Sequence, residues 1–125
     1  MPARSIHLLL YVRDTAQAAT FYKLLGFKPV SRGLTANSFI FGTVRISLVN
    51  EKKIHPALRR SGGKASRKGQ GVYFYLLGQK VDTLYKKLTA AGVKLSHAPK
   101  NWPWGYREFV VKDLDGYHWV IAQRL

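Results

Sequence analysis

The chain has 125 residues, of which 46% are hydrophobic, and its 21 lysines and arginines against six aspartates and glutamates give a net charge of +15. This length fits one globular domain, the composition excludes an intrinsically disordered chain, and no apolar run approaches the roughly 20 residues of a membrane-spanning helix. The absence of cysteine excludes disulfides, thiolate ligands and thiol nucleophiles, so we expect a cytoplasmic protein. Because of its net positive charge, we expect the protein surface to attract anions and repel cations.

The first half of the chain predicts an opening strand at residues 6–12, then one helix, then three further strands. The opening apolar run is too short for a signal peptide. Asp14 can cap the helix, Gln17 completes a capping-box pattern, and Gly26 is placed to end it. The apolar face of this helix consists of Ala18, Phe21, Tyr22 and Leu25, and the later strands are predicted at residues 28–32, 38–41 and 44–49.

Residues 51–71 form a long connection that holds four glycines and seven basic residues. A connection of this length is unusual inside a compact domain. We interpret it as a solvated surface loop, or as a hinge through which two subunits exchange modules. A specific binding element is the less favoured interpretation.

The second half repeats the element order of the first, so that β-α-β-β-β occurs twice. Residues 72–77 predict a strand, and Gly92 ends a helix whose apolar face carries Val81, Leu84, Tyr85, Leu88 and Ala91. Further strands are predicted at residues 93–96, 107–112 and 117–122. Between the last two, Asp113-Leu114-Asp115-Gly116 predicts a tight turn, in which the aspartates are turn residues and Gly116 supplies a positive φ.

Two stretches of the sequence carry a family resemblance. The first is Pro103-Trp104-Gly105-Tyr106-Arg107-Glu108-Phe109 with the aspartate turn after it, and the second is Ile6-His7-Leu8-Leu9 with Asp14, Phe21-Tyr22 and Leu25-Gly26-Phe27. Together they resemble the vicinal oxygen chelate superfamily, which includes glyoxalase I, extradiol dioxygenases and bleomycin resistance proteins. The form of the first stretch is most similar to the bleomycin resistance branch. One departure is Leu114, where the family usually has proline.

The resemblance implies an α+β fold of two tandem βαβββ modules, which form a curved, partly open mixed sheet around a concave cavity. The modules would be residues 1–50 and 72–125 of a single domain, joined by the basic linker 51–71. It also implies a homodimer.

The metal enzymes of this family place one ligand at each of four strand positions, which correspond here to His7, Ser47, Tyr73 and Val120. Only His7 is a good ligand, because a catalytic divalent ion needs about three imidazole or carboxylate donors. We therefore expect no metal and no cofactor. His118 would point into the same cavity, where a pair with His7 would make at most a weak site.

Aromatic and basic side chains are then expected to line the cavity. If His7 faces inward, Tyr11 does too, and the same strand periodicity directs Tyr73 and Tyr75 inward. Stacking on such rings favours a planar ligand, and an arginine would hold an acidic group on it. The complete set of predicted ligand-binding residues is His7, Tyr11, Arg45, Tyr73, Tyr75, Trp102, Trp104, Arg107 and His118.

The favoured hypothesis is a small-molecule binding protein that sequesters an aromatic, neutral or anionic ligand. Bleomycin-binding relatives hold a cationic drug, which the charge of +15 disfavours here. A second hypothesis is a metal-dependent glyoxalase-like or dioxygenase-like enzyme with altered ligands. A third is a polyanion or nucleic-acid binder that uses the basic linker, although no nucleic-acid-binding motif supports it beyond charge.

Overall fold

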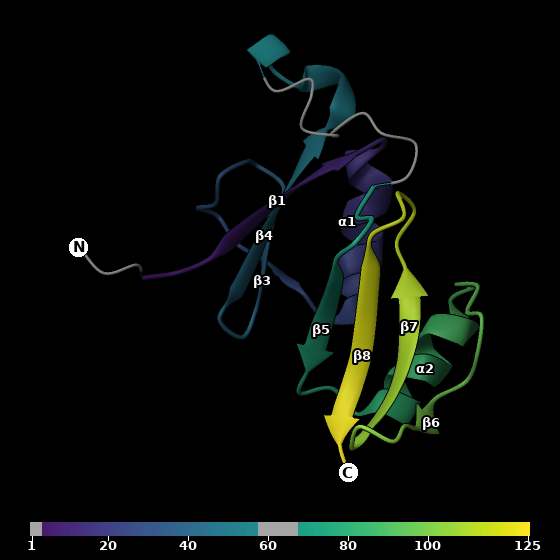
Figure 1. Ribbon diagram of the computed structural model, residues 1–125. Helices are drawn as coiled ribbons and strands as arrows, with labels where there is room; N and C mark the ends of the chain where they lie inside the picture. The colour runs from purple at the N-terminus through teal and green to yellow at the C-terminus, as the bar shows by residue number, and fades with distance from the viewer. Residues whose placement is uncertain (1–3, 58–67) are drawn as a thin grey trace. The chain divides into compact units, whose positions relative to one another are not determined.

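The computed structural model describes residues 4–57 and 68–125, and it divides the chain into two compact units, Met1–Lys68 and Gly69–Leu125 (Figure 1). Each unit contains one four-stranded mixed sheet and one α-helix. The predicted α+β class with two tandem modules is therefore confirmed.

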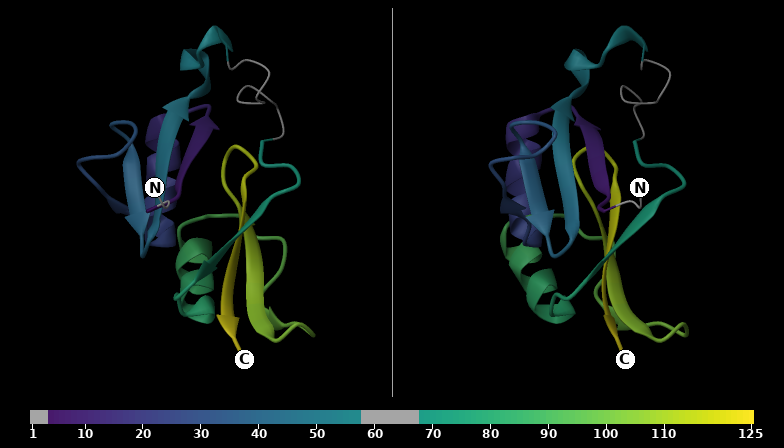
Figure 2. Two further views of the ribbon diagram at one scale, coloured as in Figure 1. Left: turned by 60° about the vertical axis from the view of Figure 1, so that its left-hand side comes forward. Right: turned by 90° about the vertical axis from the view of Figure 1, so that its left-hand side faces the viewer.

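Unit 1 has the sheet order β1-β4-β3-β2, with β1 and β4 parallel and the other pairs antiparallel. Helix α1 lies along one face of this sheet (Figure 2). Leu10 and Val12 in β1 and Ile46 in β4 are buried on that side. The elements are β1 His7–Val12, α1 Thr15–Leu25, β2 Lys28–Pro29, β3 Ser38–Phe41 and β4 Val44–Asn50.

Local sequence signals set the ends of α1. The backbone N–H of Gln17 donates to Asp14 Oδ1 at 3.0 Å, which satisfies one of the free donors of the first turn. Gly26 ends the helix with φ of 104°, as expected for a left-handed glycine cap. Both predictions are confirmed. No helix in the described ranges is long and apolar enough to cross a membrane.

The predicted strand at residues 28–32 is shorter in the structure and ends at Pro29. One further ladder bond follows, from the N–H of Val30 to the carbonyl of Ser38 at 3.0 Å. The chain then bends across the sheet, and Gly33 lies so close to Ser38 that an added Cβ would be 2.0 Å from its Oγ. The strand ends because the backbone turns toward Ser38 after Val30.

Unit 2 has the sheet order β5-β8-β7-β6, with β5 and β8 parallel. Helix α2 lies behind this sheet in the view of Figure 1. Tyr85 of the helix makes an edge contact with Phe109 of β7, with ring centroids 5.5 Å apart. The elements are β5 Tyr73–Leu77, α2 Val81–Ala90, β6 Lys100–Asn101, β7 Tyr106–Lys112 and β8 His118–Arg124.

The predicted strand at residues 93–96 is wrong. The backbone N–H of Val93 donates to the carbonyl of Leu88 at 3.0 Å, in a helix-ending turn that Gly92 makes possible with φ of 86°. The chain joins β7 only after Pro99, where Lys100 pairs with Glu108. The neighbour of β7 is thus the two-residue strand Lys100–Asn101, and not residues 93–96.

The predicted turn at residues 113–116 is confirmed. Asp113 Oδ1 accepts the backbone N–H groups of Asp115 and Tyr117, both at 2.9 Å. Gly116 has φ of 101°, which glycine adopts without steric strain. Asp113 and Asp115 are both buried, and the carboxyl group of Asp113 holds the turn together.

Of the linker predicted at residues 51–71, residues 58–67 lie outside the described residues. At its beginning, Glu51–Lys53 forms one short 3₁₀ turn. The ammonium of Lys68 is 2.8 Å from Glu51 Oε2, and its side chain is only 3% exposed. Lys68 is therefore a buried ion-pair partner, unlike the solvated bases expected in this segment.

Replacing Asp14 with alanine should lower the free energy of unfolding by about 1 kcal/mol, because the first turn of α1 loses its acceptor. Urea denaturation followed by circular dichroism measures the change. Asp14→Asn is the matched control, since the amide oxygen can still accept from Gln17. Equal stability of the alanine and asparagine variants would contradict the capping role.

Candidate functional site

The face of the unit 2 sheet that lies opposite α2 carries a concentration of aromatic side chains. Strand pleating puts successive side chains on opposite faces, so Phe109 faces α2 while Glu108 and Val110 do not. The register aligns Tyr75 with Val120, and Val120 with Val110. We call this side the open face. It carries Tyr73, Tyr75, Leu77, Tyr106, Glu108, Val110, Lys112, His118, Val120, Ala122 and Arg124.

Glu108 is the polar centre of the open face. It is only 5% exposed, and its Oε1 accepts hydrogen bonds from the Tyr75 hydroxyl and from Trp104 Nε1, each at 3.2 Å. Its backbone carbonyl accepts from Trp102 Nε1 at 3.4 Å. Its other carboxylate oxygen, Oε2, is buried without a hydrogen-bond partner in the described structure. Glu108 thus orients three aromatic side chains that come from different parts of unit 2.

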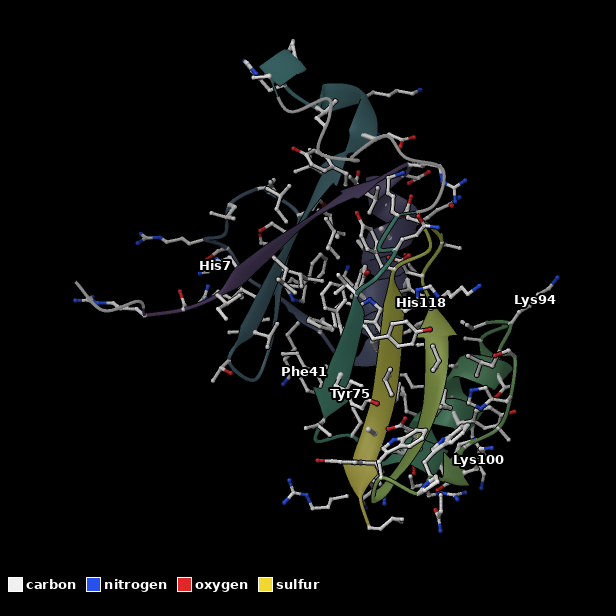
Figure 3. All side chains as sticks on the ribbon, viewed as in Figure 1. His7, Phe41, Tyr75, Lys94, Lys100 and His118 are labelled. Atoms are coloured by element: carbon white, nitrogen blue, oxygen red, sulfur yellow. The ribbon has the colours of Figure 1, made fainter. Side chains whose placement is uncertain are left out.

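These side chains form a group that we call the aromatic cluster, consisting of Tyr75, Trp102, Trp104 and Tyr106. The two indoles stack with centroids 4.8 Å apart and planes 14° apart, and Lys100 Nζ lies 3.6 Å from the ring centroid of Trp102. Trp104 is 56% exposed and Tyr75 is 50% exposed, although both are held by hydrogen bonds. The cluster therefore presents fixed, accessible ring surface. Figure 3 shows Tyr75, His118 and Lys100 on the side of the sheet away from α2.

A cavity of about 450 Å³ adjoins the aromatic cluster, and Tyr106 belongs to both. The Tyr106 ring contacts Tyr75 edge-on, with centroids 6.5 Å apart, and its hydroxyl accepts from Arg124 Nη2 at 3.3 Å. Lys80 and Arg124 supply two positive charges to the lining, and none of its described residues carries a carboxylate. This volume is within the range of small-molecule sites. The cavity combines apolar wall with basic groups.

Two pKa values record the electrostatics of this region. Burial raises the pKa of Tyr75 above its ordinary value of 10.0, and the negative charge and hydrogen bond of Glu108 raise it further. The hydrogen bond to Tyr106 raises the pKa of Arg124. Near neutral pH, Tyr75 is therefore an uncharged donor and Arg124 a permanent cation.

Three other predicted site residues of unit 2 lie outside the aromatic cluster, two of them on the open face. Tyr73 stacks on His118 with centroids 4.9 Å apart and planes 8° apart, and His118 Nδ1 is buried without a hydrogen-bond partner in the described structure. Arg107 points to the helix-covered side, where its Nε and Nη2 donate to the two carboxylate oxygens of Asp82 at 2.9 and 2.8 Å. Arg107 therefore holds α2 against the sheet and is not part of the aromatic cluster.

In unit 1, His7 and Arg45 are direct partners in the parallel β1–β4 ladder. His7 Nε2 is 3.0 Å from Ser5 Oγ, and Arg45 Nη1 donates to the carbonyl of Arg32 at 3.4 Å. Tyr11 is half-buried and lies on the His7 side of β1. That residues of both units line one concave cavity stays a prediction.

The four family-equivalent metal positions do not fit a divalent ion. His7 offers an imidazole, but Ser47 is only 1% exposed and its hydroxyl is hydrogen-bonded to Ser38 Oγ at 2.7 Å. Val120 has no donor atom, and the phenol of Tyr73 is neither an imidazole nor a carboxylate. Within residues 4–57 and 68–125, no three histidine, aspartate or glutamate side chains gather to hold an ion.

Sequence reasoning missed Lys80, Tyr106 and Arg124 and left the direction of Glu108 open. The signal was the apolar pair Phe109 and Val111: once these face the helix, strand periodicity puts Tyr106 and Glu108 on the open face. Lys80 lines the cavity because of the way the β5–α2 connection folds, which no sequence pattern indicated, and Arg124 lines it from the end of β8.

The profile of the Glyoxalase/Bleomycin resistance protein/Dioxygenase superfamily matches residues 4–121. The structure is similar to that of a superfamily member from Sphaerobacter thermophilus, with 24% identity over 97% of both chains and a TM-score of 0.69. It is also similar to a virulence protein of Salmonella typhimurium, with 24% identity over 100% of this chain and 99% of that chain and a TM-score of 0.69.

A glyoxalase/bleomycin resistance protein/dioxygenase from Nocardioides is a third similar structure, with 22% identity over 100% of this chain and 87% of that chain and a TM-score of 0.71. At these identities the likeness establishes the fold. No curated protein gives a significant match to the sequence.

Replacing Glu108 with glutamine should lower the pKa of Tyr75 toward 10.0 without reaching it, because the negative charge is removed while burial remains. Because the pKa of Tyr75 is raised in the folded state, protonated Tyr75 contributes to the free energy of unfolding below pH 10. This contribution is lost as the pH rises through the raised pKa. Ultraviolet titration of tyrosinate measures the shift, and Tyr75→Phe identifies the transition. Identical titrations of the wild type and Glu108→Gln would contradict the assigned contact.

Proposed function

This chain belongs to the Glyoxalase/Bleomycin resistance protein/Dioxygenase superfamily, and we propose that it binds and sequesters a small aromatic molecule without a metal ion. The observation that carries the proposal is the aromatic cluster, in which a buried carboxylate fixes the exposed rings of Tyr75 and Trp104 beside a cavity. Binding of this kind requires no bond to be made or broken.

Ring stacking supplies the affinity. One face of Trp104 stacks on Trp102, and more than half of the Trp104 side chain remains exposed. A planar ligand that contacts one or two such rings gains about 0.5–1.5 kcal/mol for each, beyond the apolar area it buries. Because Glu108 already orders Tyr75 and Trp104, little side-chain entropy is lost on binding.

The charge of the cavity favours a neutral or anionic ligand. Lys80 and Arg124 line it, and the guanidinium of Arg124 can hold a carboxylate, sulfonate or phosphate group. The Glu108 carboxylate is buried under the rings and bonded to two donors, so it presents little charge to an incoming ligand. The net charge of +15 steers anions toward the protein.

The enzyme hypothesis is weaker because the family-equivalent positions provide one imidazole, one bonded serine, one phenol and one valine. The polyanion hypothesis depends on the basic linker, and four of its seven basic residues lie outside the described residues. That the protein is a homodimer stays a prediction. Sedimentation or light scattering can test it by measuring the molecular mass in solution.

Naphthalene derivatives that differ only in charge test the proposed ligand class. We expect 2-naphthol and 2-naphthoate to bind, and a trimethylammonium analogue to bind more weakly, in calorimetric titrations at physiological salt. Trp104→Ala should weaken binding by about 2- to 12-fold, which corresponds to the stacking energy of one ring. Arg124→Gln should weaken naphthoate more than naphthol.

Two variants serve as controls for that experiment. Leu114→Ala removes another large exposed side chain, in the β7–β8 turn, and Arg107→Gln changes a charge on the helix-covered side. Both should bind the naphthalenes as the wild type does. Equal loss in Leu114→Ala and Trp104→Ala would sink the assignment of the site.

Protein purified without chelators should contain far less than one equivalent of Zn, Ni, Mn or Fe by elemental analysis. Treatment with EDTA should leave both the thermal midpoint and the affinity for 2-naphthoate unchanged. A stoichiometric transition metal that is lost on replacing His7 with alanine would favour the enzyme hypothesis instead.

A further inference from the structure

The outer edges of the two sheets are covered to different extents. In unit 1, β3 has four residues, and its outer edge pairs with residues 28–30: Lys28 with Ile40, Pro29 with Phe39, and the N–H of Val30 with the Ser38 carbonyl. In unit 2, β7 has seven residues, but β6 pairs with only Arg107 and Glu108. On the side away from β8, the far end of β7 therefore has no neighbouring strand among the described residues.

The direction of the main-chain groups along β7 follows from two hydrogen bonds. The N–H of Trp102 donates to the carbonyl of Tyr106, so even-numbered residues of β7 point their main-chain groups outward. The N–H of Asp113 donates to Tyr117, so odd-numbered residues point toward β8. The outward N–H and C=O groups of Val110 and Lys112 have no hydrogen-bond partner in the described part of the chain.

A cavity of about 300 Å³ lies at this uncovered edge. Its lining consists of Val110 and Lys112 from β7 and of Lys94, Leu95 and Ser96 from the segment that was expected to be a strand. Two lysines therefore face one space, together with a hydroxyl and two apolar side chains, and no acidic residue of residues 4–57 or 68–125 lines it. Figure 3 shows Lys94 and Lys100 on the segment that runs outside β7.

We propose that the β7 edge at Val110–Lys112 is a docking site for an acidic peptide of another protein, which adds to the sheet as an extended strand. Free donors and acceptors on a strand edge are a template for strand addition. A strand satisfies both kinds of group, whereas a small anion satisfies only the donors. The basic lining selects an acidic sequence over a second copy of this chain, whose charge is +15.

The side chains of the edge define the peptide further. Val110 and Lys112 both project on the open face, so residues two apart in the peptide lie beside them. The peptide residue beside Val110 should be apolar, because Leu95 forms the other wall, and the residue beside Lys112 should be acidic. The expected pattern is acidic-x-apolar, in either chain direction.

A blocked peptide of sequence Gly-Glu-Thr-Val-Thr-Glu-Gly tests the site, since it places an acid two residues from valine in both directions. It should bind in calorimetric titrations, and the version with glutamine for both glutamates should bind about threefold or more weakly. Amide hydrogen exchange of Val110 and Lys112 should be fast in the free protein and slow with peptide. The amides of Phe109 and Val111 should be protected in both states.

Val110→Pro is the sharpest variant, because it removes the outward donor and leaves the ladder with β8 intact. It should abolish peptide binding while the Phe109 and Val111 amides stay protected. Lys112→Glu should weaken the acidic peptide by about threefold or more and favour a version with lysines in place of glutamates. Lys28→Glu makes the same charge change on β2 and should leave binding unchanged.

Four results would overturn the proposal. One is protection of the Val110 and Lys112 amides without peptide, since the edge would then be closed. Another is competition by succinate as effective as the peptide, which would indicate a small-anion site. Concentration-dependent self-association that is lost in Val110→Pro would indicate a second copy as the occupant. Equal weakening by Lys28→Glu and Lys112→Glu would indicate attraction by net charge alone.

Discussion

In strand β7, pleating sends Phe109 and Val111 against α2 and sends Tyr106 and Glu108 to the opposite face. These two rows of side chains cannot exchange places without burying the Glu108 carboxylate against the helix, so the register of this strand is strongly specified. With the register fixed, Glu108 lies under the rings of the aromatic cluster and Arg107 lies beside Asp82. The same alternation decides which main-chain groups face β8 and which face outward.

Charge acts on this protein at two scales. Over the whole surface, the excess of basic residues gives a field that draws anions from a distance and weakens with salt. At the aromatic cluster the important group is a single buried carboxylate, and its role is to hold ring donors in place. The sign of the net charge therefore predicts which ligands approach, while the local hydrogen bonds determine the shape that they meet.

Much of the fold could be predicted because it follows from local rules. The cap at Asp14, the glycine turns and the duplicated element order each depend on residues close in sequence. The strand at 93–96 could not be predicted correctly, because its apolar alternation competes with a helix-ending bond from Val93 to Leu88 that only the folded chain reveals. The contact of Arg107 with Asp82 could not be predicted for a related reason, because the motif does not say which residue distant in sequence its guanidinium meets.

In unit 1, Ser47 shares its hydroxyl bond with Ser38, and Gly33 packs directly over that pair. A carboxylate introduced at position 47 would need more room than a hydroxyl, and the crossing backbone leaves none. A carboxylate at position 47 would therefore require remodelling of residues 31–37 as well. The packing of Gly33 on the two serines thus constrains which side chains this strand position can carry.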